Sequence, residues 1–171
     1  MEKIYELAIV GAGPAGIATA VESYLQGVRD IVLLEKDTNH NSTIRKYYKE
    51  NKRVDLEWKG QKVELNGRIH FIDGTKETTL DFFDEILKEH LVELQTEVEV
   101  QSIEKKEDYF EVHMAGRSIK AKNVVVTIGR MGSQTNRATK SPQLYERKLT
   151  IQQMNAHREK RFLLSEAVTV L

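Results

Sequence analysis

The apolar run Ile4–Val10 leads directly into a glycine-rich segment, the glycine loop, Gly11-Ala12-Gly13-Pro14-Ala15-Gly16. The run predicts a buried strand, and residues 14–26 predict a helix with one apolar face. In such a strand–turn–helix, the first glycine permits the tight turn and the second lets the backbone approach a pyrophosphate. The third lets helix and strand pack closely, so that phosphates lie at the helix N-terminus. The segment therefore predicts a dinucleotide-binding turn.

An acidic residue stands at the position that such a turn requires. Residues 31–34 predict a second strand, and Glu35 follows it, 19 residues after Gly16. A carboxylate about 20 residues after the glycines accepts hydrogen bonds from ribose hydroxyls. A glycine motif alone is a weak signal, but strand, turn, helix, strand and carboxylate together predict a right-handed βαβ unit.

The composition is that of a soluble globular domain. The chain has 171 residues, 40% hydrophobic and 30% charged, with a formal net charge of zero. The balanced charge favours neither nucleic acid nor a membrane surface as a partner, and no apolar run approaches the roughly 20 residues that span a bilayer. The N-terminus lacks the features of a secretory signal, so a cytoplasmic location is expected.

Cysteine is absent, which excludes disulfides, thiolate catalysis and cysteine-ligated metals within this sequence. The five histidines are scattered along the chain: His40, His70, His90, His113 and His157. Their spacing matches no metal-binding motif, so we expect surface or structural roles and no metal site.

The middle of the chain gives weaker signals. Residues 37–76 are polar and contain a possible helix, 43–51, and two possible strands, 62–65 and 68–72, around Asn66-Gly67. Aromatic residues here could line a flavin or substrate cleft, although a small core under a long loop is the preferred interpretation. These residues are Tyr47, Tyr48, Trp58 and Phe71.

Clearer elements follow. Residues 80–94 predict an amphipathic helix whose apolar face includes Phe83, Leu87, Leu91 and Leu94. Three alternating segments, 97–104, 109–114 and 117–121, predict an antiparallel meander. Residues 123–128 are almost continuously apolar and predict a buried parallel strand before Gly129.

This order resembles the FAD-binding domain of the pyridine-nucleotide disulfide oxidoreductases, and is most similar to their thioredoxin-reductase-like group. Besides the glycine loop and the strand before it, the resemblance is carried by Leu34-Glu35-Lys36 and by Val124-Val125-Val126-Thr127-Ile128-Gly129. The last segment is similar to a family strand that ends in Ala-Thr-Gly, although the middle here reads Thr-Ile-Gly. The ending Gly-Arg-Met-Gly resembles a branch near the bacillithiol-disulfide reductases, which act without a Cys-x-x-Cys pair.

The resemblance covers residues 1–132 and implies an α/β fold. The expected domain is Rossmann-like and binds FAD: a parallel sheet with a βαβ unit and a three-stranded antiparallel meander, incomplete at the C-terminus. In the parent protein, a cytoplasmic homodimer, NAD(P)H bound to a second domain would reduce the flavin, which would reduce a disulfide or a similar acceptor. The FAD-binding half implies no acid, base or nucleophile, so no catalytic residue is assigned.

The resemblance also implies roles for individual residues. Gly11 to Gly16 would hold the FAD pyrophosphate, and Glu35 would bind the adenosine ribose. Lys36 and Val98 are weaker candidates for the adenine side. Thr127 and Gly129 would pass close to the cofactor.

Residues 133–171 differ from the rest in composition. They hold seven Lys or Arg against three Glu and none of the ten glycines. In the family a linker and a second Rossmann domain follow here, and a segment without glycine cannot form a second dinucleotide turn. We hypothesise that the gene is read in a shifted frame after Gly132, so that residues 133–171 are a basic tail and not a domain.

Possible codons support this hypothesis. Read from the third base of the Gly132 codon, they permit Lys-Pro-Asn-Lys-Pro-Ser-Tyr-Lys-Ile-Pro-Pro, a proline-rich connector. The same shift over residues 152–171 permits TNECTSGEKILVVGGGNSA, an apolar strand running into a glycine-rich turn. Two family-like segments in one frame favour the loss of a single base. The competing interpretation is a genuine basic tail or C-terminal helix.

A shifted frame has consequences for activity. The chain's return to the FAD domain would be missing, which would expose apolar surface and an unpaired sheet edge. We therefore expect weak or no FAD retention and no NAD(P)H-dependent turnover. Two alternatives stay open: a stand-alone NAD-binding Rossmann module, and a non-catalytic remnant without a cofactor. The meander and the Pro-Ala within the glycine loop favour FAD.

Overall fold

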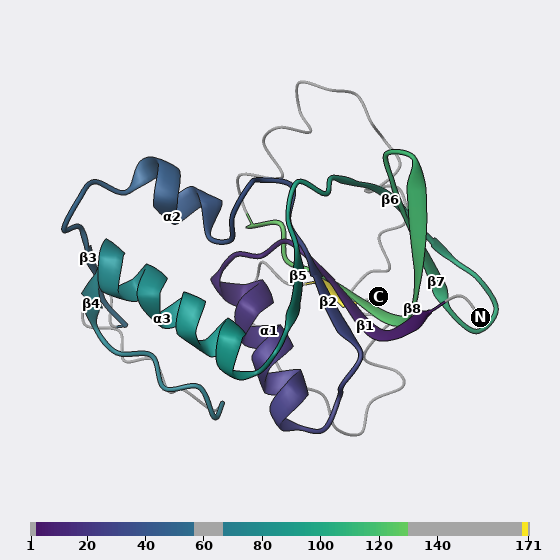
Figure 1. The fold of residues 1–171 in the computed structure, drawn as a ribbon, viewed down its shortest axis with the longest axis horizontal. Helices are drawn as coiled ribbons and strands as arrows, with labels where there is room; N and C mark the ends of the chain where they lie inside the picture. Colours follow the sequence, from purple (N-terminus) through teal and green to yellow (C-terminus); the bar gives the residue numbers. More distant parts are fainter. Residues whose placement is uncertain (1–2, 57–66, 130–168, 171) are drawn as a thin grey trace.

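The computed structural model describes residues 3–56, 67–129 and 169–170 (Figure 1). Its helices and strands follow in the order β1 (Ile4–Val10), α1 (Pro14–Leu25), β2 (Ile31–Leu34), α2 (Ser42–Tyr47), β3 (Arg53–Val54), β4 (Gly74–Thr75), α3 (Lys76–Glu89), β5 (Glu93–Gln95), β6 (Val100–Lys105), β7 (Phe110–Met114), β8 (Arg117–Val126) and β9 (Thr169–Val170). Among the residues described, no helix is both long and apolar enough to cross a membrane.

One sheet organises the fold. Its strands run in the order β5-β2-β1-β8-β7-β6, with β9 paired to β8. The first four strands of this order are parallel, whereas β8, β7 and β6 pair in antiparallel fashion. A separate pair, β3 and β4, lies beside α3 (Figure 1). The predicted α/β, Rossmann-like architecture is therefore confirmed, with β1-α1-β2 as its βαβ unit and β6-β7-β8 as its meander.

The central strands are buried on both faces. On one face α1 and α3 pack over the sheet (Figure 1), in a core that includes Ile9, Ile17 and Phe83. On the other face, residues such as Val32 pack against the meander, where Val112 is fully buried. A strand covered on both sides has no solvent-facing positions. This explains why β2 and the second half of β1, from Leu7 to Val10, are unbroken apolar runs, whereas the start of β1 has an exposed Ile4 and a partly exposed Glu6.

The last meander strand and the buried parallel strand are one element, β8, and not the two strands expected at 117–121 and 123–128. Its first half pairs with β7, from Arg117 to Ala121. The pairing with β1 begins at Lys120 and continues to Val126. The two registers overlap, so the chain passes from one partner to the other without a break. Tertiary pairing, and not the local pattern, decides this continuity.

The helix expected at 80–94 is displaced toward the N-terminus as α3. It begins at Lys76 because Thr75 and Thr78 form a reciprocal capping box, in which each side chain bonds the other residue's backbone N–H. It ends at Glu89, and Leu91 adopts a positive φ of 48°. Leu91 is 84% exposed, and residues 93–95 form β5, a parallel strand beside β2 that the pattern did not predict.

The polar stretch also differs from expectation. The helix predicted at 43–51 is the shorter α2, and residues 68–72 form no strand, whereas residues 62–65 lie outside the described parts of the chain. Tyr47 and Tyr48 are exposed and belong to no core cluster of the described residues, so their expected place in a small core is wrong. Phe71 does pack on α3, edge-on to Phe82 at 6.0 Å between ring centroids. Trp58 is not among the described residues.

Candidate functional site

The carboxyl ends of the parallel strands meet at one edge of the sheet. Backbone hydrogen bonds join the residues that follow these strands: Gly11 N–H to Leu34 O at 2.7 Å, Glu35 N–H to Gln95 O at 2.9 Å, and Thr127 N–H to Val10 O at 2.8 Å. Ligands of open α/β sheets bind beyond this edge. The structure therefore brings the glycine loop, the acid after β2 and the residue after β8 to the place where a dinucleotide would bind.

Close backbone packing explains two of the three glycines. Gly11 has a φ of 101°, and a Cβ there would lie 2.6 Å from Thr127 O. A Cβ on Gly16 would overlap Gly11 O and lie 2.7 Å from Thr127 Oγ1. Contacts this short do not occur for real side chains, so both positions require glycine for the fold itself. The roles predicted for these two glycines, a tight turn and close helix packing, agree with this geometry.

Gly13 differs from the other two glycines. It is the N-cap of α1 in an extended conformation, with a φ of −80°. No atom of the described residues lies within 4 Å of a Cβ built on it. The helix has no side-chain cap and no acidic residue in its first turn. Its N-terminal N–H groups and positive dipole end are therefore left to attract an anion, and the backbone beside them has room for one.

Glu35 is held in place from two sides. Its side chain is buried, and its carboxylate accepts hydrogen bonds from Ala12 N–H at Oε2 (2.9 Å) and from Asp37 N–H at Oε1 (3.0 Å). An ionised carboxylate offers about four acceptor positions, so two remain for a ligand. The residue thus has a structural role in the glycine loop, which the sequence did not reveal, besides its predicted ribose-binding role.

Thr127 fixes the glycine loop against β8. Its buried hydroxyl lies 2.8 Å from Gly11 O and 3.1 Å from Val10 O, so it donates to the loop backbone. Gly129, two residues on, is exposed and has a φ of 64°. Thr127 and Gly129 thus follow β8 beside the glycine loop, and their predicted proximity to the cofactor stays a prediction. The hydroxyl of Thr127 points to the protein backbone.

The two weaker candidates lie beside Glu35. Val98 donates its backbone N–H to Glu35 O at 2.8 Å, and its half-buried side chain packs on the core under the meander. Lys36 is exposed. Glu97, which has a φ of 58°, turns the chain between β5 and β6, so β6 begins at Val100 and not at 97 as expected. The turn brings Val98 beside Glu35, and its contact with the adenine stays a prediction.

A buried polar group next to the glycine loop was missed. Asn41, which is 1% exposed, donates its backbone N–H to Ala12 O at 2.8 Å. Its neighbour His40 is 2% exposed and bonds to Asn41 and to Asp84 of α3. His40 therefore has a structural role, as expected of the histidines in general. No motif marks it, because its partner lies 44 residues away in the sequence.

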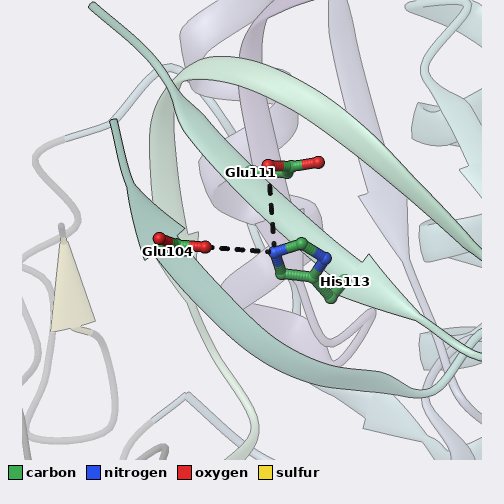
Figure 2. Close-up of side chains that lie close together, drawn as sticks. All are labelled: Glu104, Glu111 and His113. Carbon is green, nitrogen blue, oxygen red and sulfur yellow. Dashed lines mark ion pairs between the residues drawn. The ribbon is translucent and has the colours of Figure 1, made fainter. Parts of the chain in front are cut away.

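The meander carries a second polar group, which lies apart from the glycine loop. Figure 2 shows Glu104 of β6 and Glu111 and His113 of β7 pointing toward one another. His113 Nε2 lies 3.7 Å from Glu104 Oε2 and 4.0 Å from Glu111 Oε2. Glu111 and His113 share a strand face by their spacing of two, but only the register brings in Glu104.

These three residues could hold a metal ion by distance alone, since their donor atoms lie within 4.8 Å of one another. Lys106 already neutralises the carboxylates: its Nζ lies 2.7 Å from Glu104 Oε1 and 3.9 Å from Glu111 Oε2. The hydrogen bond from Lys106 lowers the pKa of Glu104. The arrangement is that of a surface ion-pair cluster.

Comparison with known proteins supports the fold. The structure resembles the bacillithiol disulfide reductase of Staphylococcus aureus with a TM-score of 0.58 and 19% identity, over 75% of this chain and 39% of that one. It resembles thioredoxin reductase of T. acidophilum with a TM-score of 0.56 and 24% identity, over 75% and 36%.

Sequence comparison extends this likeness. A ferredoxin–NADP reductase of Leuconostoc mesenteroides is 29% identical over 134 residues, which are 76% of this chain and 35% of that protein. This chain thus spans about a third of its relative's length. The family model described as pyridine nucleotide-disulphide oxidoreductase matches residues 8–164. With this match over most of its length, the chain belongs to the pyridine nucleotide-disulphide oxidoreductase family.

Proposed function

We propose that residues 1–132 are the FAD-binding portion of an NAD(P)H-dependent flavoprotein oxidoreductase of the thioredoxin- or disulfide-reductase type. The observation that carries this proposal is the uncapped N-terminus of α1 beside the open space at Gly13. A pyrophosphate fits there because its charge is attracted by the helix dipole and its oxygens accept from the first N–H groups. The complete parent would be a cytoplasmic homodimer.

The chain's own residues would bind and orient the cofactor. Gly13 and the first turn of α1 would receive the pyrophosphate, and Glu35 would use its remaining acceptor positions for the ribose hydroxyls. Lys36 and Val98 would lie toward the adenine, and Thr127 and Gly129 near the rest of the molecule. FAD, when bound, would carry electrons from NAD(P)H to a disulfide or similar acceptor. We assign no proton transfer to this chain.

FAD is favoured over NAD by the arrangement around the site. The glycine loop and the acid serve both cofactors equally well. The meander that covers the sheet opposite α1 and α3, together with the family membership, supports FAD. A ferredoxin–NADP reductase and a thioredoxin reductase among the relatives support a reductase of the same general type.

Titration of the purified chain with FAD, followed by flavin fluorescence, tests this function. We expect saturable but weak binding, little flavin retained after gel filtration, and no oxidation of NADPH. Saturable NADH binding without FAD binding would instead indicate a stand-alone NAD-binding module. Binding of neither nucleotide would leave a remnant without a cofactor. A stoichiometric yellow monomer that oxidises NADPH would show that the chain is active, contrary to this proposal.

We also propose that residues 133–171 are translated from a shifted frame, as the composition and the permitted codons suggest. The family match continues past Gly132 to residue 164. Within residues 133–171, the structure describes the two residues of β9, Thr169 and Val170. The nucleotide sequence after the Gly132 codon decides the matter. We expect that restoring one base there opens a frame with the proline-rich connector and a second glycine-rich turn. Codons incompatible with these segments would rule the shift out.

A further inference from the structure

A chain of polar side chains connects α3 to the glycine loop; His40 and Asn41 are buried in it, whereas Asp84 and Arg45 are partly exposed. His40 and Asn41 precede α2 and are 2% and 1% exposed. Asp84, from the middle of α3, and Arg45, from α2, complete the group, which we call the His40 network. Buried polar groups of this kind are costly unless each is hydrogen-bonded, so a network that persists has a definite geometry.

The hydrogen bonds of the network fix the position of each member. The Asp84 carboxylate accepts from His40 Nε2 at 2.8 Å, and Arg45 Nη2 lies 3.1 Å from the same ring nitrogen. On the other side of the ring, His40 Nδ1 lies 2.8 Å from Asn41 Nδ2. The imidazole ring is therefore held between Asn41 and Asp84.

Arg45 closes the network on the side of α2. Its Nε donates to His40 O at 2.9 Å and its Nη2 donates to Asp84 Oδ2 at 3.4 Å. Desolvation acts to raise the pKa of Asp84, but the hydrogen bond from His40 and the positive charge of Arg45 act against it, and the pKa is lowered. The Asp84 carboxylate is therefore ionised at neutral pH and accepts the hydrogen bonds from His40 and Arg45.

The other end of the network contacts the cofactor-binding backbone. Asn41 N–H donates to Ala12 O at 2.8 Å, and Ala12 N–H donates to Glu35 Oε2 at 2.9 Å. The peptide groups on both sides of Ala12 are thus fixed, one by Asn41 and one by Glu35. At this contact the backbone of Asn41 adopts a left-handed conformation, with a φ of 53°. Its side-chain Oδ1 is buried without a hydrogen-bond partner among the described residues. Strained and unsatisfied groups concentrate at functional sites.

We propose that His40 and Asp84 are positioning residues, which orient the Ala12–Gly13 peptide of the glycine loop through Asn41 and so couple α3 to cofactor binding. The inference rests on the proposed FAD-binding function. Their proposed role is indirect, through Asn41 and Ala12. Without Asp84, His40 Nε2 loses its carboxylate acceptor, and Asn41 loses the fixed orientation that its contact with Ala12 needs.

The experiment compares three variants of the full chain: Asp84→Ala, Asp84→Asn and, as a matched control on the same helix, Glu85→Ala at an exposed position. Hydrogen exchange of the Asn41 amide measures its bond to Ala12 O without any cofactor, and titration with FAD measures affinity. Asp84→Ala should speed exchange at Asn41 and weaken FAD binding, each by about tenfold, the equivalent of one buried hydrogen bond.

Asp84→Asn should keep both the slow exchange of the Asn41 amide and the FAD affinity, because its amide oxygen still accepts from His40 Nε2. For Asp84→Asn, the exchange rate at Asn41 and the FAD affinity should stay within about threefold of the parent values, because the hydrogen bond is retained. Glu85→Ala should change neither quantity. Unchanged exchange and affinity in Asp84→Ala, or equal effects in Glu85→Ala, would overturn the inference. If the parent chain binds no FAD, the proposed function fails, and exchange at Asn41 alone decides whether the network positions the loop.

Discussion

Replacing Gly16 with alanine should destabilise the fold by about 3 kcal/mol, the upper part of the range for overpacked sites. The added Cβ would overlap Gly11 O and approach Thr127 Oγ1 to 2.7 Å. Alanine gains about 1 kcal/mol of helix propensity over glycine, but a backbone carbonyl held by β1 and β8 cannot move to accept the methyl group. Thermal unfolding should show a fall in Tm of roughly 6 to 12 °C for a chain of this size.

Gly13→Ala is the matched control in the same loop. Its backbone is extended and no atom of the described part of the chain lies within 4 Å of the new Cβ, so unfolding should change by less than about 0.5 kcal/mol. The methyl group would instead occupy the space that a pyrophosphate needs, and FAD affinity should fall at least about tenfold, or 1.4 kcal/mol. Equal stability of Gly16→Ala and the parent, or full FAD affinity of Gly13→Ala, would contradict the assignment of a structural and a binding glycine.

Glu35→Ala should produce the second large effect, on both folding and binding. The change leaves the N–H groups of Ala12 and Asp37 without their acceptor. An unsatisfied buried donor costs about 1 to 3 kcal/mol, so a loss of about 2 to 4 kcal/mol of unfolding free energy is expected. FAD binding should be lost as well, because the proposed ribose acceptor and the fixed position of Ala12 disappear together. Urea unfolding and FAD titration measure the two effects.

Glu99→Gln provides the control for this prediction, since it removes an exposed carboxylate next in sequence to Val98, whose backbone N–H donates to Glu35 O. This variant should leave the free energy of unfolding and the FAD affinity unchanged. Glu35→Gln should be intermediate, because its amide keeps one acceptor oxygen but turns an NH₂ group toward the second donor. If Glu35→Ala lowered FAD affinity without loss of stability, the hydrogen bonds that Glu35 accepts from Ala12 and Asp37 would be unimportant to the fold.

Strongly periodic or continuously apolar segments could be predicted from the sequence with their bounds. The strands Ile4–Val10 and Ile31–Leu34 have the predicted limits, because the parts of them that are buried on both faces, from Leu7 to Val10 and over all of β2, are continuously apolar. Elements whose ends depend on distant partners were placed less well. The start of α3 depends on the Thr75 and Thr78 capping box, and β5 exists because three residues pair with β2. Three residues carry too little pattern to indicate a strand.

The residues of the candidate site also fall into those that a local pattern reveals and those that only the structure reveals. The glycine loop and Glu35 have a fixed spacing along the chain, so a local pattern was sufficient to find them. His40 and Asp84 are 44 residues apart, and Thr127 lies 116 residues from the Gly11 carbonyl that it binds. Contacts over such separations are set by the packing of α2, α3 and β8 around the loop, and no short motif encodes them.

The sequence by itself determined the βαβ unit, the dinucleotide-type turn and the identity of the acid after β2, because steric and phosphate-binding requirements restrict these positions to particular residue types. Only the tertiary structure decided that β8 joins the meander to the parallel sheet and that Glu35 is bonded to the loop. It alone also decided that His40 and Asp84 connect α3 to Ala12. Those features depend on which distant groups are brought within hydrogen-bond distance, and burial makes such bonds specific and costly to lose.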